Sequence, residues 1–136
     1  MEDVHVRLQV GDELYALPIE HVVEVMEVGK LATVPGAGSG LLGVANLRGQ
    51  VLPVFDLGRV FGLRRDQPPL RIVVAERNGE LAGFAVDDVT DVAPLGTELE
   101  ETDVDHLRCA LLEHGSLVGV VDIDRIFSVL AREAIA

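Results

Sequence analysis

Few residues of this 136-residue chain have the types and spacing that catalysis or metal binding requires. The four histidines, His5, His21, His106 and His114, stand at no spacing that is typical of a metal site. The glycine-rich stretch 36–40 contains no lysine and joins two strand-like segments, whereas a phosphate-binding loop leads from a strand into a helix. We therefore expect neither a metal ion nor another cofactor.

Acidic pairs are the remaining candidates for acid–base or cation chemistry. Asp87 is followed by Asp88, and Asp122 stands two residues before Asp124. Adjacent carboxylates on a strand point to opposite faces of a sheet, and Asp122 is placed to cap a helix. We predict a protein without catalytic activity, and a small acid-dependent hydrolase using Asp87 or Asp122 is kept as a remote alternative.

Charge excludes two classes of partner. The chain carries 23 acidic against 11 basic residues, for a formal net charge of −12. Such a surface repels the phosphates of nucleic acids and of anionic membranes, so we expect no nucleic-acid binding and no direct membrane insertion. Cys109 is the only cysteine, which permits no intrachain disulfide, and the first residues lack the features of a signal peptide. These observations predict a cytoplasmic protein.

Composition favours a β-rich fold. Hydrophobic residues make up 49% of the chain, but only 4% are aromatic and tryptophan is absent. The core must therefore consist of valine, leucine, isoleucine and alanine, and valine is typical of strands.

One hairpin is the element around which the chain is organised. Two apolar runs within 41–57 lie on either side of 46–49, where Gly49 can take the positive φ of a tight turn. The pattern predicts a β-hairpin with Arg48 at or beside its turn. Asp56 is then expected to cap a short helix that ends near Gly62.

The preceding residues predict a second hairpin. Residues 4–10 alternate apolar and polar side chains, which indicates a half-buried strand, and a Gly-Asp turn leads to a return strand over 14–17. A short helical turn over 18–21, an extended segment over 22–28 and a loop over 35–40 complete the region.

An internal repeat follows a polar break at 64–69. At an offset of 67 residues Glu80 matches Glu13 and Asp91 matches Glu24, and at an offset of 66 Asp122 matches Asp56. We interpret residues 1–136 as a single domain of two related, intertwined lobes. Each lobe is a small bent sheet or barrel followed by a helix, and the last helix begins at Asp122.

Four stretches carry a family resemblance. The block 43–57 reads Gly-Val-Ala-Asn-Leu-Arg-Gly-Gln-Val-Leu-Pro-Val-Phe-Asp-Leu, which closely resembles the signature of the CheW family of bacterial chemotaxis coupling proteins. The similarity continues through 15–25, 81–89 and 115–122, so it covers nearly the whole chain.

This resemblance implies both a fold and a function. The implied fold is all-β, with two five-stranded SH3-like β-barrels, short helices and a C-terminal helix. The implied function is that of a non-catalytic adaptor. Such proteins couple the cytoplasmic tips of methyl-accepting chemoreceptors to the regulatory domain of a CheA-type histidine kinase.

The resemblance also implies candidate partner-binding residues. Arg48, in the matched motif with Asn46, is expected to form an ion pair with Glu24. A groove between the lobes is expected to receive receptor helices. The candidate groove-lining residues are Val23, Val25, Val86 and Val89.

The chain departs from the family pattern in one region. Residues 93–117 form a shorter connection than is usual in the family, on a surface implied in kinase contact. The alternative is therefore a CheW-like regulatory module of a non-motility sensory system that binds only one partner.

Overall fold

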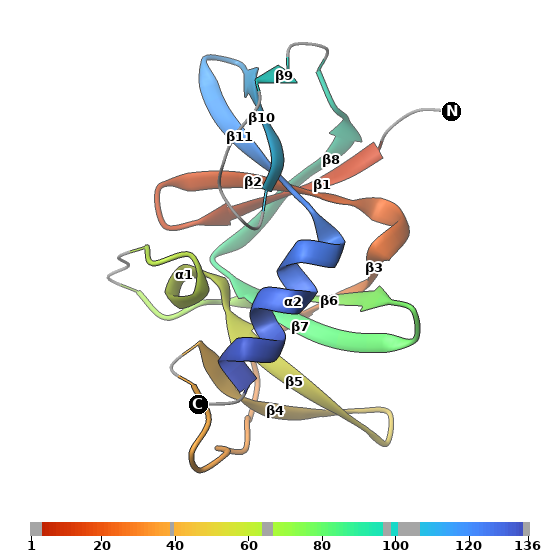
Figure 1. The fold of residues 1–136 in the computed structure, drawn as a ribbon, viewed down its shortest axis with the longest axis vertical. Coiled ribbons are helices and arrows are strands. Elements are labelled where there is room, and N and C mark those ends of the chain that lie inside the picture. Colours follow the sequence, from red (N-terminus) through yellow and green to blue (C-terminus); the bar gives the residue numbers. More distant parts are fainter. Residues whose placement is uncertain (1–3, 39, 64–66, 97–98, 101–106, 135–136) are drawn as a thin grey trace.

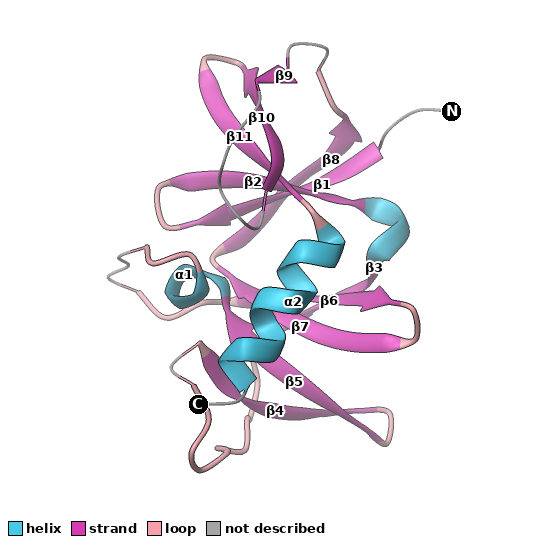
Figure 2. Cartoon of the chain, in the orientation of Figure 1, coloured by secondary structure: helices cyan, strands magenta, loops and turns pink. Residues whose placement is uncertain are grey.

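The computed structural model describes residues 4–38, 40–63, 67–96, 99–100 and 107–134, and these residues form a strand-rich fold (Figures 1 and 2). The helices are the 3₁₀ turn η1 (Ile19–His21), α1 (Leu57–Val60) and α2 (Ile123–Ala134). The strands are β1 (Val4–Val10), β2 (Glu13–Pro18), β3 (Val22–Glu27), β4 (Leu41–Leu47), β5 (Gln50–Asp56), β6 (Arg71–Arg77), β7 (Glu80–Val86), β8 (Asp88–Pro94), β9 (Leu99–Glu100), β10 (Leu107–Glu113) and β11 (Ser116–Val121).

The strands form two sheets that correspond to two SH3-like β-barrel subdomains. Sheet A has the order β8-β1-β2-β11-β10-β9, and sheet B has the order β3-β6-β7-β5-β4. The expected all-β class is confirmed. Sheet A has a sixth strand beyond the expected five, because the two-residue β9 pairs with β10.

Each sheet takes strands from both halves of the sequence. In sheet A the hairpin β1–β2 pairs with β8 and with β11, while in sheet B the hairpin β6–β7 pairs with β3 and β5. Neither half of the chain could therefore complete a sheet alone. The proposed polar break at 64–69 lies partly outside the described residues.

Turn chemistry fixes the hairpins. Three hairpins have the two-residue turns Arg48-Gly49, Asn78-Gly79 and His114-Gly115, and all six of these residues have positive φ. This geometry is that of the type I′ turn, whose twist matches that of the flanking strands.

Both predicted helix caps are present. The Asp56 carboxylate accepts a hydrogen bond from the Gly58 N–H at 2.9 Å, and the Asp122 carboxylate accepts one from the Arg125 N–H at 3.1 Å. These bonds satisfy amide groups at the start of α1 and α2.

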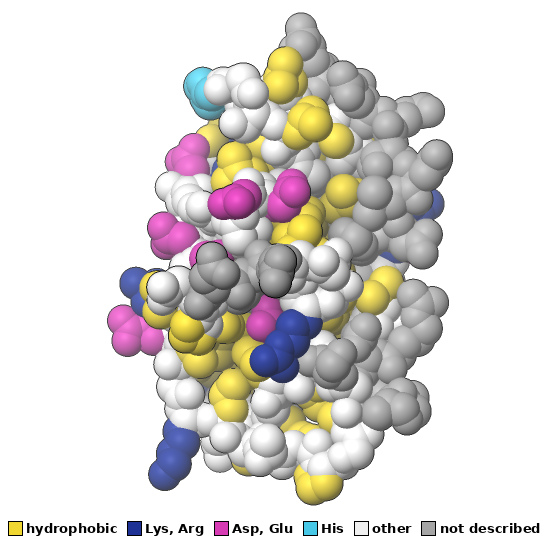
Figure 3. Space-filling view, turned by 90° about the vertical axis from the view of Figure 1, so that its left-hand side faces the viewer, with side chains coloured by type: hydrophobic (Ala, Val, Ile, Leu, Met, Phe, Trp, Pro, Cys, Tyr) yellow, Lys and Arg dark blue, Asp and Glu magenta, His cyan; other side chains and the backbone are white. Residues whose placement is uncertain are grey.

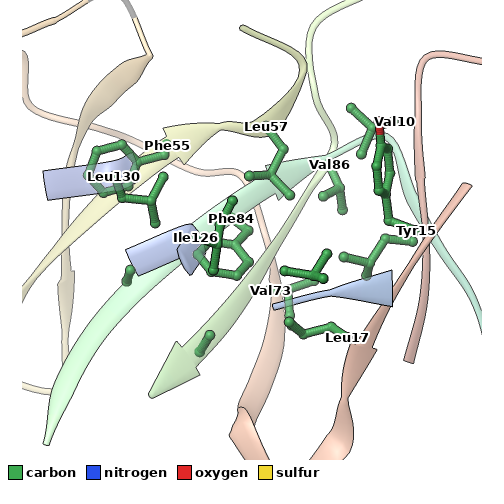
Figure 4. Close-up of a cluster of buried hydrophobic side chains, with 14 of the residues drawn as sticks. Val10, Tyr15, Leu17, Phe55, Leu57, Val73, Phe84, Val86, Ile126 and Leu130 are labelled. Carbon is green, nitrogen blue, oxygen red and sulfur yellow. The ribbon is translucent and has the colours of Figure 1, made fainter. Parts of the chain in front are cut away.

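One hydrophobic cluster joins the two sheets. Figure 4 shows Leu17 of β2, Phe84 of β7 and Ile126 of α2 among the side chains of this cluster, and all three are fully buried. Helix α2 runs beside the sheets in Figure 1 and contributes its apolar face to this cluster. The space between the sheets at this point is therefore filled by core.

The expectation that 4–10 is a half-buried strand is wrong. His5 and Arg7 are 2% and 7% exposed, so β1 is buried on both faces. The reason is that Val6, Leu8 and Val10 pack in the cluster that joins the sheets, while on the opposite face the Arg7 side chain binds Glu113 of β10.

Candidate functional site

The predicted ion pair between Arg48 and Glu24 is present. Arg48 Nη2 lies 2.5 Å from Glu24 Oε1, and the two side chains are 70% and 31% exposed. Strands β3 and β4 are the two edges of sheet B, so this pair links one edge of the sheet to the hairpin turn at the other. The backbones of Ala32 and Val44 also pair, with hydrogen bonds of 2.9 Å in both directions. The pair therefore lies where sheet B closes on itself.

Exposure limits the energy of this pair. An ion pair of this exposure contributes about 0–1 kcal/mol, since water competes for both groups. The backbone bridge and the core hold the sheet closed, and the ion pair sets the charge and shape of the surface.

Asn46 stabilises the turn that carries Arg48. Its Oδ1 accepts a hydrogen bond from the Gly49 N–H at 2.9 Å, while the residue itself is exposed. The side chain thereby helps to hold Arg48 in its positive-φ conformation, next to Gly49.

Exposed apolar side chains lie on the same edge strand and hairpin as the ion pair. Val23 and Val25 are 45% and 43% exposed and lie on one face of β3, whereas Glu24 lies on the other face with Val22 and Met26, which pack against the core. Sequence reasoning missed Val51, which is 74% exposed and pairs with Asn46 beside the turn. The signal was available, because strand alternation places Val51 opposite to the buried Leu52. We call Val23, Glu24, Val25, Asn46, Arg48 and Val51 the β3–hairpin surface.

Val86 is not part of any exposed surface. It is fully buried in the cluster that joins the sheets, so its expected role in lining a groove is wrong. The reason is that β7 lies at the centre of sheet B, between β6 and β5, and both of its faces are buried. Val86 packs in the cluster that joins the sheets, and Ala85 packs in a second cluster on the other face. Val89 is half-buried and packs against the same cluster, which leaves only part of its side chain open to a partner.

A buried ion pair in sheet A was also missed. Arg7 Nε and Nη2 donate to the two carboxylate oxygens of Glu113 at 3.0 and 2.6 Å. Its guanidinium donates further to the carbonyls of His5, Ala93 and Pro94 at 3.1, 2.6 and 2.8 Å. The hydrogen bonds that Glu113 accepts from Arg7 hold the pKa of its carboxyl below the ordinary value of 4.5, although partial burial opposes the shift.

The acidic residues considered for catalysis have structural partners. Asp87 accepts a hydrogen bond from the Gly11 N–H at 2.7 Å, and Asp122 caps α2 and lies 3.7 Å from Arg125 Nε. Within the described parts of the chain, no group of three or more histidine, cysteine, aspartate or glutamate side chains could hold a metal ion. The described helices are too short or too polar to span a membrane. Cys109 is free and buried, as its apolar neighbours predict.

Comparison with known proteins places this chain in a family. The model of the CheW-like domain matches residues 5–131. The chain is 32% identical over 130 residues to the chemotaxis protein CheW of Helicobacter pylori, a match that covers 93% of this chain and 76% of the relative. It is 29% identical over 139 residues to the chemotaxis protein CheW of Rhizobium meliloti, which covers 95% and 90% of the two chains. The crystal structure of the scaffolding protein TtCheW from Thermoanaerobacter tengcongensis superposes with a TM-score of 0.82, at 27% identity and 90% coverage of both chains. The chain belongs to the CheW family.

Proposed function

We propose that this protein is a non-catalytic adaptor of bacterial chemosensory signalling, which couples chemoreceptors to a CheA-type histidine kinase. The observation that carries this proposal is the match of the CheW-like domain to residues 5–131, which is nearly the entire chain. The related TtCheW is described as a scaffolding protein, and the two folds agree over 90% of both chains.

Physical features support an adaptor in particular. The β3–hairpin surface combines three exposed valine side chains with an ion pair that sets the charge and shape of the surface between two sheet edges. Apolar anchors beside a fixed charged pair are typical of protein–protein interfaces, which need both desolvated area and a means of fixing register.

The proposal extends to the partners' binding regions. The β3–hairpin surface would receive the cytoplasmic tip of a methyl-accepting chemoreceptor, and the kinase would bind through its regulatory domain. The adaptor would then work in the cytoplasm by binding both partners at once, so that a change in the receptor alters kinase activity through shared interfaces.

Reconstitution from purified components tests this function. Membranes containing the receptor are mixed with the kinase, with and without this protein, and sedimented. We expect the kinase to enter the pellet, and its autophosphorylation to respond to receptor ligand, only when this protein is present. Sedimentation of this protein with only one partner would support the single-partner alternative, and sedimentation with neither would contradict the proposal.

A further inference from the structure

The two sheets carry structurally equivalent turns. In sheet B the β4–β5 turn is Arg48-Gly49, and in sheet A the β10–β11 turn is His114-Gly115. Arg48 and His114 have φ values of 48° and 50°, and the glycines that follow have 85° and 82°. Each hairpin also contains a register shift at the same distance from its turn, between Leu41 and Gly43 in one and between Leu107 and Cys109 in the other. His114 therefore occupies in sheet A the position of Arg48 in sheet B.

The facing edge strands are equivalent as well. In sheet B Glu24 of β3 pairs in register with Val74 of β6, and in sheet A Asp91 of β8 pairs in register with Arg7 of β1. The offset of 67 residues relates both members of these pairs. Asp91 therefore occupies the position of Glu24, and the repeat brings Asp91 and His114 to one place as it does Glu24 and Arg48.

A cavity takes the place of the ion pair in sheet A. Arg48 contacts Glu24 directly, but no ion pair joins Asp91 to His114 in the structure as described. Instead these two residues line a surface cavity of about 280 Å³, together with Arg7, Thr90, Glu113 and Ser116. Histidine is shorter than arginine and aspartate is shorter than glutamate, which accounts for the open space between them.

The cavity has an excess negative charge. The carboxylate of Glu113 is compensated by the buried guanidinium of Arg7, which it binds through both oxygens. The exposed carboxylate of Asp91 accepts a hydrogen bond from the Val92 N–H at 2.8 Å, and no cation among the described residues lies within ion-pair distance of it. The Asp91 carboxylate is therefore the charge in this cavity that a single cationic group of a partner can balance.

We propose that this cavity binds the arginine side chain of a partner polypeptide, with the guanidinium beside Asp91 as Arg48 lies beside Glu24. A guanidinium matches a carboxylate through two parallel hydrogen bonds, which an ammonium cannot form. Leu14, Ala93 and Pro94 also line the cavity and can cover the methylene groups of the arginine.

NMR titration of the full chain with N-acetyl-arginine amide tests the site. We expect saturable shifts of the amide signals of Asp91, Gly115 and Ser116, with a Kd of about 1–30 mM, as suits a single side chain. N-acetyl-citrulline amide has the same shape without the charge and should not saturate these shifts. Asp91→Asn should weaken binding at least tenfold, whereas Asp88→Asn, on the same exposed strand outside the cavity, should not.

A second variant keeps the test independent of Asp91. His114→Arg supplies the equivalent of Arg48 from the chain itself, so it should abolish binding of the probe while the spectrum stays that of a folded protein. Equal binding of the citrulline and arginine probes, shifts that map to other residues, or unchanged binding in both Asp91→Asn and His114→Arg would overturn the proposal.

Discussion

Arg7 occupies in sheet A the position that Val74 occupies in sheet B, and both side chains are buried. Their neighbours also differ between a charged and an apolar residue. Arg7 binds Glu113, whereas the equivalent of Glu113 in sheet B is Leu47, which shares a buried cluster with Val74. One repeat thus has a buried ion pair at the point where the other has an apolar contact. The surface shows the reverse, since sheet B carries the exposed Glu24–Arg48 pair and sheet A an open cavity.

The space-filling view in Figure 3 shows acidic and hydrophobic side chains lying next to one another on one face of the molecule.

This exchange predicts a strong coupling between Arg7 and Glu113. Arg7→Val leaves the Glu113 carboxylate without its partner, and Glu113→Leu leaves the buried Arg7 guanidinium with carbonyl acceptors but no counter-charge, so each should lower the free energy of unfolding by about 3–5 kcal/mol. The double variant reproduces the Leu47 and Val74 pair of sheet B and should recover most of this loss. Urea denaturation of the four proteins measures the coupling.

The outcome for the double variant decides between two roles of Arg7. Recovery to within about 2 kcal/mol of the original protein would show that charge compensation dominates. A loss equal to the sum of the two single variants would contradict this and would assign the stability to the bonds from Arg7 to the carbonyls of Ala93 and Pro94.

Local patterns predicted most of the fold, and long-range contacts set the limits of that prediction. The turn at Gly49 and the caps at Asp56 and Asp122 depend on neighbouring residues, and all three are present. The burial of Arg7 depends on Glu113, which is 106 residues away, so the alternation of β1 alone places this polar side chain incorrectly in water.

In the candidate site, too, some features follow from a sequence motif and others only from long-range strand pairing. The family motif correctly predicted the contact between Arg48 and Glu24, which lie 24 residues apart. Val86 was placed wrongly, since its burial follows from the position of β7 at the centre of sheet B, which only the pairing of β5, β6 and β7 determines. The expected short connection at 93–117 lies partly outside the described residues.

Acid should destabilise the protein through Glu113. Arg7 lowers the pKa of this carboxyl in the folded state below its ordinary 4.5, so the unfolded chain takes up the proton first. The stabilisation is complete above pH 4.5 and is lost as the pH falls through the folded-state pKa. Thermal unfolding measured between pH 3 and pH 7 should therefore show a steeper acid loss in the original protein than in Glu113→Gln. Exposed Glu76 provides the control, and an equal slope for Glu76→Gln and Glu113→Gln would contradict the prediction.

Alkali should act through Tyr15, which is the only tyrosine in the chain. Its ring packs against Phe61 with a centroid distance of 4.7 Å, and burial followed by the nearby charge of Glu13 raises the pKa of its phenol from 10.0 to about 12. Between these values the unfolded chain loses the proton and the folded chain keeps it, so stability falls as the pH rises above 10. Absorbance at 295 nm should give a midpoint near pH 12 for the folded protein and near pH 10 in denaturant. A folded-state midpoint near 10 would show that the phenol is open to water.

Arg48 should affect assembly more than stability. Arg48→Ala removes a pair whose side chains are 70% and 31% exposed, so the free energy of unfolding should fall by less than about 1 kcal/mol and the melting temperature by only a few degrees. Assembly of the receptor–kinase complex should weaken clearly, because the positive charge at the β4–β5 turn is lost and Glu24 is left without its partner. Arg59→Ala is the matched control, since Arg59 is also an exposed arginine beside an acid, with Nε 3.7 Å from Asp56 Oδ2 and 57% of the side chain exposed. Co-sedimentation with receptor membranes and kinase measures the effect. Unchanged sedimentation of Arg48→Ala would show that Arg48 does not contribute to assembly, and an equal loss in Arg59→Ala would show that general surface charge is responsible.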